Sequence, residues 1–212
     1  MTSLGCTALC LLDRSTQQLL QSPAWQHGAA LHAFARAFNW WGGQGVIWLA
    51  ALLWFGGRAL GWKRIAEVGL RGAEGTAVSS AMSGITKGLA SRARPFVTPG
   101  EPWHFEFARG WTDAHWFSMP SGHTTATFGF AVAASFAVAR FAPLPRALFR
   151  ALALSSAVAV AFARVYTDQH WLTDVLVGAI LGAVTGWLLT RLHRRFGPSA
   201  FDRALLGGTP PS

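Results

Sequence analysis

The sequence predicts an all-α fold: a polytopic membrane bundle of about five transmembrane helices, preceded by an N-terminal helix lying along the membrane interface. Three observations support this class. Hydrophobic residues make up 51% of the chain and charged residues only 13%, about half the usual charged share of a soluble domain. Long stretches carry no charge, and the 11 tryptophans belong to the residue type that gathers at membrane surfaces. Residues 1–212 are expected to form one domain, with 1–36 as the interfacial segment and 193–212 as a cytoplasmic tail.

The first elements can be placed from hydropathy and small-residue spacing. The stretch Leu11–Phe38 is expected to lie along the interface as an amphipathic helix. Ala37–Gly57 contains no charge and is long enough to cross a bilayer as the first membrane helix. Gly72–Ala90 is only weakly hydrophobic, so a polar loop is the alternative. Its Ser80, Gly84 and Gly88 repeat every four residues, which favours a second helix that packs closely against its neighbours.

Three further membrane helices are expected in the C-terminal half. Trp116–Ala139 is uncharged, whereas Ala151–Ala163 and Val175–Thr190 are short apolar runs bracketed by charged residues. A span of about 20 residues is needed to cross the hydrocarbon. The last two helices are therefore expected to extend into the polar residues that flank them.

The positive charges are distributed unevenly over the two ends of this bundle. Eleven Lys and Arg residues follow the first, third and fifth helices: Arg58, Lys63, Arg64, Arg71, Arg140, Arg146, Arg150, Arg191, Arg194, Arg195 and Arg203. By the positive-inside rule this end is cytoplasmic. The net charge of +9 does not indicate a nucleic-acid partner, because the cations are not clustered on one polar helix and no binding motif accompanies them. The two cysteines, Cys6 and Cys10, are expected to be incidental, with neither a disulfide framework nor a metal ligand set.

Three fragments on the opposite, outer side carry the chemistry. They are Lys87 with Arg94-Pro95, then Pro120-Ser121-Gly122-His123, then Arg164 with His170 and Asp174. Together they supply two histidines, one carboxylate and three cations. Phosphoryl transfer depends mainly on positioning and on fixed positive charge around the phosphoryl oxygens. The set therefore indicates cleavage of a phosphate ester, with no metal and no cofactor.

The spacing K-x6-R-P, P-S-G-H and R-x5-H-x3-D resembles the phosphatidic acid phosphatase type 2 (PAP2) superfamily. The resemblance covers residues 87–174 directly, with two departures. Ala163 stands where the family usually has serine before the third-motif arginine, and a smaller departure is Ala93 before Arg94, at a position where the family tolerates variation. The resemblance implies a metal-independent lipid phosphatase of the bacterial cytoplasmic membrane with its site facing the periplasm or exterior. Small bacterial members act on undecaprenyl diphosphate, phosphatidylglycerophosphate or lipid A. Undecaprenyl diphosphate is the preferred substrate here, because an outward-facing site suits recycling of the polyprenyl carrier. The oligomeric state is left open.

The resemblance and the spacing together assign roles to the motif residues. His170 and Asp174 are four positions apart, so on a helix they would share a face and the carboxylate would orient the nucleophilic imidazole. Ser118 could cap a helix beginning at Pro120, with Ser121 and Gly122 binding phosphate and His123 acting as general acid. Lys87 and Arg94, two helical turns apart, and Arg164 would bind the phosphate oxygens.

Other readings stay open. The alternatives are a lipid phosphotransferase, an enzyme resembling the vanadium haloperoxidases, and a non-catalytic phospholipid-binding membrane protein. The loop between the first two motifs carries further polar residues that could contact a substrate headgroup or be polar simply because loops are. These are His104, Glu106, Arg109, Asp113 and His115.

Overall fold

The computed structural model describes residues 8–197 and 200–206, and its architecture is helical throughout. Among these residues the β pairing is limited to one isolated bridge, Arg92 with Phe105. Cys10 forms a disulfide, so the expectation of incidental cysteines is wrong for this residue. Cys6 lies outside the described residues.

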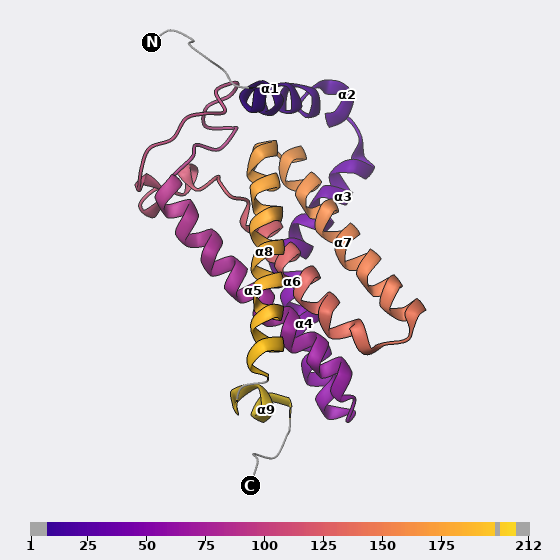
Figure 1. Ribbon diagram of the computed structural model, residues 1–212. Coiled ribbons are helices and arrows are strands. Elements are labelled where there is room, and N and C mark those ends of the chain that lie inside the picture. Colours follow the sequence, from indigo (N-terminus) through magenta and orange to yellow (C-terminus); the bar gives the residue numbers. More distant parts are fainter. Residues whose placement is uncertain (1–7, 198–199, 207–212) are drawn as a thin grey trace.

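The N-terminal segment crosses one end of the bundle. Helix α1 (Ala8–Leu20) and the single turn α2 (Pro23–Gln26) lie across the end of α8, as an interfacial helix would (Figure 1). The chain then turns into the bundle as α3 (Ala29–Trp40), and a π-helical turn (Trp41–Gly45) joins α3 to α4 (Val46–Ala59). The expected first membrane helix is therefore longer than Ala37–Gly57 and begins inside the segment assigned to the interface.

Helix α5 (Lys63–Ala90) confirms the weakly hydrophobic helix and excludes the polar-loop alternative. Of the predicted residues, Gly88 packs closely, since a Cβ there would lie 2.1 Å from the Trp111 ring, whereas Ser80 and Gly84 do not. A Cβ on Gly72 would lie 2.3 Å from the Phe130 ring and one on Gly75 would lie 2.4 Å from the Gly129 carbonyl, whereas Gly84 faces open space. The close contact of α5 with α6 therefore uses the helix face that carries Gly72 and Gly75. Ser80 is exposed and takes no part in it.

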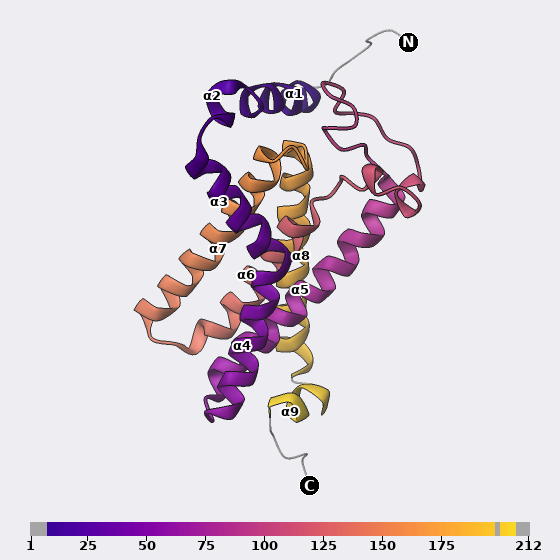
Figure 2. The same ribbon diagram turned by 180° about the vertical axis from the view of Figure 1, so that it is seen from behind.

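Helix α6 (Gly122–Ala137) is central and contacts α5, α7 (Pro143–Tyr166) and α8 (Leu172–Phe196). It begins six residues later than the expected Trp116, because an irregular segment precedes it. Short 3-10 turns lie at Arg109–Trp111, Ala114–Trp116 and Val138–Arg140. Helix α9 (Ala200–Leu206) lies at the end of the bundle opposite α1 (Figures 1 and 2).

Helices α6 and α8 approach each other through three glycines that are spaced four positions apart on α8. Cβ atoms built on Gly178, Gly182 and Gly186 would lie 2.8, 2.2 and 2.9 Å from the carbonyl oxygens of residues 121, 125 and 129 on the α6 side. Only glycine permits backbones to approach so closely. This contact fixes the start of α8 against the start of α6, where the motif residues lie.

Within the described residues, two helices are long and apolar enough to cross a membrane: Pro143–Tyr166 and Leu172–Phe196. The others fall short for identifiable reasons. Helix α6 has 16 residues, α4 is separated from α3 by the π turn, and α5 carries five charged residues in its first three turns.

We expect Gly182→Ala to destabilise the protein by about 1–3 kcal/mol, because the new methyl group would overlap the Thr125 carbonyl. Gly56→Ala is the matched control on α4: its Cβ meets nothing within 4 Å, so the better helix propensity of alanine should leave stability equal or higher. Thermal unfolding in detergent measures both. Equal melting temperatures for the two variants would contradict the close α6–α8 contact.

Candidate active site

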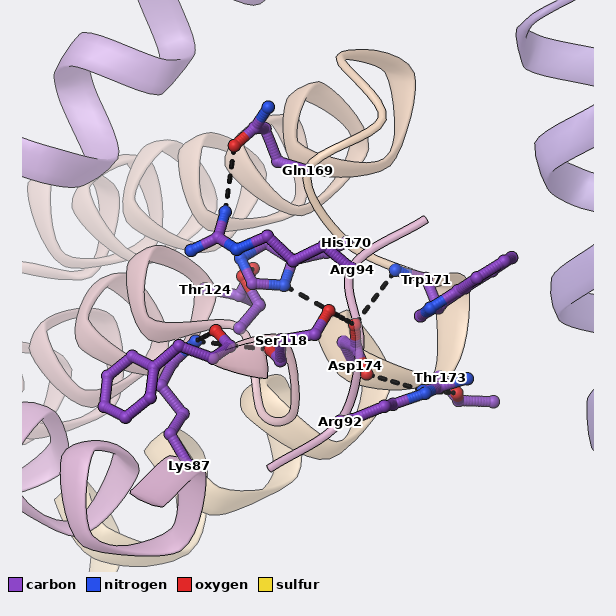
Figure 3. A network of polar contacts seen from close by, with 12 residues as sticks. Lys87, Arg92, Arg94, Ser118, Thr124, Gln169, His170, Trp171, Thr173 and Asp174 are labelled. Carbon is purple, nitrogen blue, oxygen red and sulfur yellow. Dashed lines mark hydrogen bonds and ion pairs between the residues drawn. The ribbon is translucent and has the colours of Figure 1, made fainter. Parts of the chain in front are cut away.

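The site is organised around the buried carboxylate of Asp174, in the first turn of α8 (Figure 3). Oδ1 accepts a hydrogen bond from Arg92 Nη1 at 2.5 Å, and Oδ2 accepts from Ser118 Oγ at 2.6 Å and from the backbone N–H of Trp171 at 3.0 Å. Three donors on a buried carboxylate stabilise its charged form. Asp174 is therefore held rigidly before any substrate binds.

The imidazole ring of His170 faces the carboxylate of Asp174. Its Nδ1 is 3.5 Å from Asp174 Oδ2, and the ring is only 2% exposed. The prediction that His170 and Asp174 share a helical face is wrong in detail, because α8 begins at Leu172 and His170 belongs to the preceding turn. The two side chains still face each other, but Nδ1 has no hydrogen-bond partner among the described residues, so the expected hydrogen bond to the carboxylate is not formed. With Nδ1 facing the carboxylate, Nε2 is the nitrogen available for chemistry.

Four positively charged or chargeable groups converge on His170. Burial lowers the pKa of His170 well below its usual value, and the neighbouring Lys87, Arg164, Arg94 and His123 lower it further, in that order. The structure therefore brings all three predicted cations and both histidines to one place. A low pKa keeps the imidazole neutral, which is the form that can attack phosphorus.

Each cation is held by a different part of the chain. Lys87 Nζ donates to the carbonyl oxygens of Phe117 and Ser118, at 2.7 and 3.2 Å. Arg164, in the last turn of α7, donates from Nη1 to Asn39 Oδ1 at 3.1 Å, while its buried Nε has no hydrogen-bond partner among the described residues. A buried donor without a partner is costly, so Arg164 Nε is available for a substrate oxygen.

Arg94 reaches the site from a position that the spacing did not predict. Helix α5 ends at Ala90, and Ser91 adopts left-handed backbone angles (φ 48°, ψ 60°), so Arg94 is not two helical turns beyond Lys87. It follows in an irregular segment, where Nη1 donates to Gln169 Oε1 at 2.9 Å. Burial lowers the pKa of Arg94, and the Asp174 carboxylate opposes this shift.

The start of α6 supplies the second motif. Ser121 is the residue before the helix, and its backbone N–H donates to the Asp174 carbonyl at 2.9 Å. Its buried hydroxyl accepts from Thr124 Oγ1 at 3.0 Å, so its expected role in phosphate binding stays a prediction. Ser118 is not the cap expected from sequence, because its hydroxyl donates to Asp174 instead.

A cavity of about 240 Å³ opens beside these residues and is lined by Lys87, Ser83, Gly122 and His123, among others. Gly43, from the π turn, leaves room for the His123 ring: a Cβ there would lie 2.9 Å from His123 Nε2. Ser83 Oγ is buried and has no hydrogen-bond partner in the part of the chain that the structure describes. The cavity thus combines a cation, an imidazole and an unpaired hydroxyl.

Sequence reasoning missed Arg92 and Asp13. Arg92 lies outside the three motifs, yet it is fully buried and bonded to both Asp174 and Asp13. The available signal was a single Asp within the otherwise uncharged stretch 1–13, since a lone carboxylate among apolar residues often has a buried partner.

The polar loop residues between the first two motifs pair with one another at the surface. Arg109 Nη1 contacts Glu106 at 2.6 Å and its Nη2 lies 3.6 Å from Asp113, which also accepts from His115 Nδ1 at 3.0 Å. His104 Nε2 is 3.7 Å from Glu106. Exposed pairs of this kind contribute little stability, and a role in substrate binding stays a prediction.

One group of potential metal ligands occurs among the described residues, and it is remote from this site. Glu74, His193 and Asp202 lie together near α9. The guanidinium of Arg71 lies among them and contacts all three side chains. Because a cation already occupies the centre of this cluster, it fits an ion-pair network that holds α9 against α5 and α8 better than a metal site.

Comparison with known proteins agrees with this geometry. The PAP2 superfamily matches residues 70–198, which contain all three motifs. The fold is similar to a crystal structure from Bacillus subtilis described as the first transmembrane PAP2 type phosphatidylglycerolphosphate phosphatase. The TM-score is 0.60 at 20% identity, covering 89% of this chain and 96% of the other. A search of curated proteins found no match.

The chain therefore belongs to the PAP2 superfamily, because the family match spans more than half of its length. It is an enzyme of the PAP2 phosphatase type. The residues that carried the resemblance at the level of sequence are the ones that the structure gathers around His170.

The pKa of His170 gives a pH prediction with a definite sign. A lowered pKa means that protonation removes the nucleophile only well below pH 6.5, so the free enzyme should stay competent through neutral pH. Lys87→Met removes a neighbouring positive charge and should raise the pKa of His170. We expect the acid limb of log kcat/KM against pH to move to higher pH in the residual activity of this variant.

Lys63→Met is the control for this pH profile. Lys63 is exposed at the other end of α5, about 36 Å away along the helix, so its removal should leave the limb unchanged. An identical profile for Lys87→Met and wild type would contradict the electrostatic coupling between Lys87 and His170.

Gly122 lines the cavity, and its lack of a side chain leaves space there. A Cβ on Gly122 would lie 3.5 Å from Lys87 Cε and 3.7 Å from Ser83 Oγ, in ordinary van der Waals contact. Gly122→Ala should therefore fold with an equal or higher melting temperature, because alanine favours the helix, while the methyl group takes space from the substrate and raises KM. A melting temperature well below wild type would show that the glycine is needed for folding.

Proposed function

We propose that this protein is a metal-independent lipid phosphatase that works through a phosphohistidine on His170. The observation that carries the proposal is the convergence of Lys87, Arg94, Arg164 and His123 on His170, with Asp174 on its other side. Fixed cations stabilise the charge that develops on the equatorial oxygens of a transferring phosphoryl group. The donor set is cationic, so it would repel a metal ion instead of holding one.

The proposed reaction has two steps. His170 Nε2 attacks the terminal phosphorus, and the bond from this phosphorus to the leaving oxygen breaks. This oxygen belongs to the lipid alcohol in a monoester and to the lipid phosphate in a diphosphate, and His123 donates a proton to it. Water then attacks the phosphohistidine, His123 takes a proton from it, and inorganic phosphate is released. Two of the unpaired buried groups, Arg164 Nε and Ser83 Oγ, are proposed to bond the phosphoryl oxygens, and binding of this anion favours protonated His123 at the start of α6.

We propose that the substrate tail lies between α4 and α5. An apolar groove of about 520 Å³ runs along these helices, and Ile47, Thr76 and Ser80 line both this groove and the cavity at His123. A long hydrocarbon chain could therefore occupy the groove while its phosphate enters the cavity. Such apolar volumes are typical of sites for amphiphilic ligands.

The proposed membrane arrangement has five spanning helices: α3–α4, α5, α6, α7 and α8. The cations that follow the first, third and fifth helices lie at the α9 end, which we place in the cytoplasm by the positive-inside rule. The site then faces the periplasm or exterior of a bacterial cytoplasmic membrane. The disulfide at Cys10, in a helix at the site end, supports this orientation because disulfides persist in oxidising compartments.

Undecaprenyl diphosphate is the substrate we favour, since an outward-facing site suits recycling of the polyprenyl carrier. Phosphatidylglycerophosphate is the next candidate, on the basis of the similarity to the Bacillus subtilis phosphatase, followed by phosphatidic acid and lipid A. The apolar lining of the groove does not distinguish among these tails, so the headgroup preference is left to measurement.

The test is phosphate release by detergent-purified protein in EDTA from each of these four lipids, with His170→Ala as the control. We expect release that survives EDTA and is lost in the variant by at least about 10³-fold, the scale on which removing a catalytic nucleophile acts. Labelling with a ³²P-labelled lipid and quenching in alkaline detergent, in which phosphohistidine is stable, should give a phosphoenzyme in the wild type only. Activity that disappears in EDTA, or that persists in His170→Ala, would sink the proposal; phosphate transferred to a second lipid would indicate the phosphotransferase.

A further inference from the structure

Helix α1 contributes a buried carboxylate to the network behind the site. Asp13 is 1% exposed. Its Oδ1 accepts from the backbone N–H of Thr173 at 2.8 Å, and its Oδ2 accepts from Thr173 Oγ1 and from Arg92 Nη2, each at 2.7 Å. An aspartate from the N-terminal segment is thus bonded to the first turn of α8, one residue away from Asp174.

Arg92 joins this carboxylate to the one beside the nucleophile. Nη2 donates to Asp13, Nη1 donates to Asp174 Oδ1 at 2.5 Å and to Thr173 Oγ1 at 2.7 Å, and Nε donates to the Pro102 carbonyl at 2.7 Å (Figure 3 shows the Arg92–Asp174 side). The planar guanidinium has its donors in a fixed fork. The position of Asp13 therefore fixes the plane of Arg92, and Arg92 fixes Asp174.

The charges of these three groups matter as much as their geometry. The Asp174 carboxylate must stabilise the positive charge that develops on the His170 ring as it attacks phosphorus. If Arg92 were paired with Asp174 alone, the full positive charge of Arg92 would cancel the negative charge of this carboxylate. Asp13 shares that positive charge. The buried trio carries one net negative charge, which leaves Asp174 able to act on His170.

Docking of α1 does not by itself require this buried charge. Arg14 Nε donates to the Gly100 carbonyl at 2.8 Å, Gln17 Nε2 to Asp168 Oδ1 at 3.0 Å, and Gln21 Nε2 to the Tyr166 carbonyl at 3.1 Å. Buried ion pairs contribute little net stability because desolvation opposes them. The placement of Asp13 therefore calls for an explanation beyond anchoring.

We propose that Asp13 is a positioning residue for phosphoryl transfer, acting through Arg92 to aim the Asp174 carboxylate at His170 Nδ1. The inference rests on the proposed function, because it assigns Asp13 a part in forming the phosphohistidine. Asp13 touches neither substrate nor nucleophile. Its effect should consequently fall on the rate of the chemical step and not on substrate binding.

The experiment measures phosphoenzyme formation in single turnovers with the best lipid substrate, over a range of lipid concentrations. Asp13→Asn keeps the shape and one acceptor oxygen but removes the charge. We expect its maximal rate to fall by about 10- to 100-fold, the cost of a small misplacement of reacting groups, while the half-saturating lipid concentration stays within about twofold.

Arg14→Gln is the matched control, because it weakens the attachment of α1 at Gly100 without reaching Arg92. Its rate should stay within about twofold of wild type. Equal rate losses in Arg14→Gln and Asp13→Asn would overturn the inference, since general docking of α1 would then explain both. A folded Asp13→Asn protein with wild-type rate, or with only a weaker lipid affinity, would also overturn it.

A second variant covers the case in which Asp13→Asn does not fold. Thr173→Val keeps the side-chain volume but removes the hydroxyl that bridges Arg92 and Asp13. We expect about a tenfold slower phosphoenzyme formation at unchanged half-saturation, and a wild-type rate would overturn the inference. Wild-type protein without activity on any lipid would overturn the proposed function, whereas an active wild type with equally active variants overturns only the role of Asp13.

Discussion

The structure depends on one buried carboxylate. Asp174 accepts hydrogen bonds from Arg92, Ser118 and the Trp171 backbone and faces His170. These partners come from the segment after α5, the segment before α6 and the start of α8, so a single side chain holds three separate parts of the chain in register. A carboxylate without these donors would be expensive to bury, and the segments would have no common point of attachment.

Glycine contacts along α6 make that arrangement possible. The close approach of α8 at Gly178, Gly182 and Gly186 brings the start of α8 beside the start of α6, where Ser121 N–H bonds the Asp174 carbonyl. Packing in the bundle and hydrogen bonding at its end therefore reinforce each other. A shift of either helix along the other would break the backbone bond and displace the motif residues together.

The sequence was sufficient to predict the all-helical class and the residues that gather around His170. The order of the motifs and the chemistry of their residues can be read from the sequence without knowing the geometry. The sequence was insufficient for local geometry. Arg94 and His170 were placed on helices, yet both lie in irregular segments, since Ser91 and the turn before Leu172 interrupt the helical spacing. Arg92 and Asp13 escaped notice because a partnership across 79 residues leaves no local pattern in the sequence.

The π turn between α3 and α4 has a consequence for how the sequence can change over evolutionary time. The His123 ring fills the space beside Gly43, so that a Cβ at position 43 would lie only 2.9 Å from His123 Nε2. Selection for proton transfer by His123 therefore also constrains Gly43, which lies 80 positions earlier in the chain. A chain that replaced the histidine with a smaller residue would release Gly43 from constraint, so drift at position 43 would mark lineages that have abandoned the chemistry.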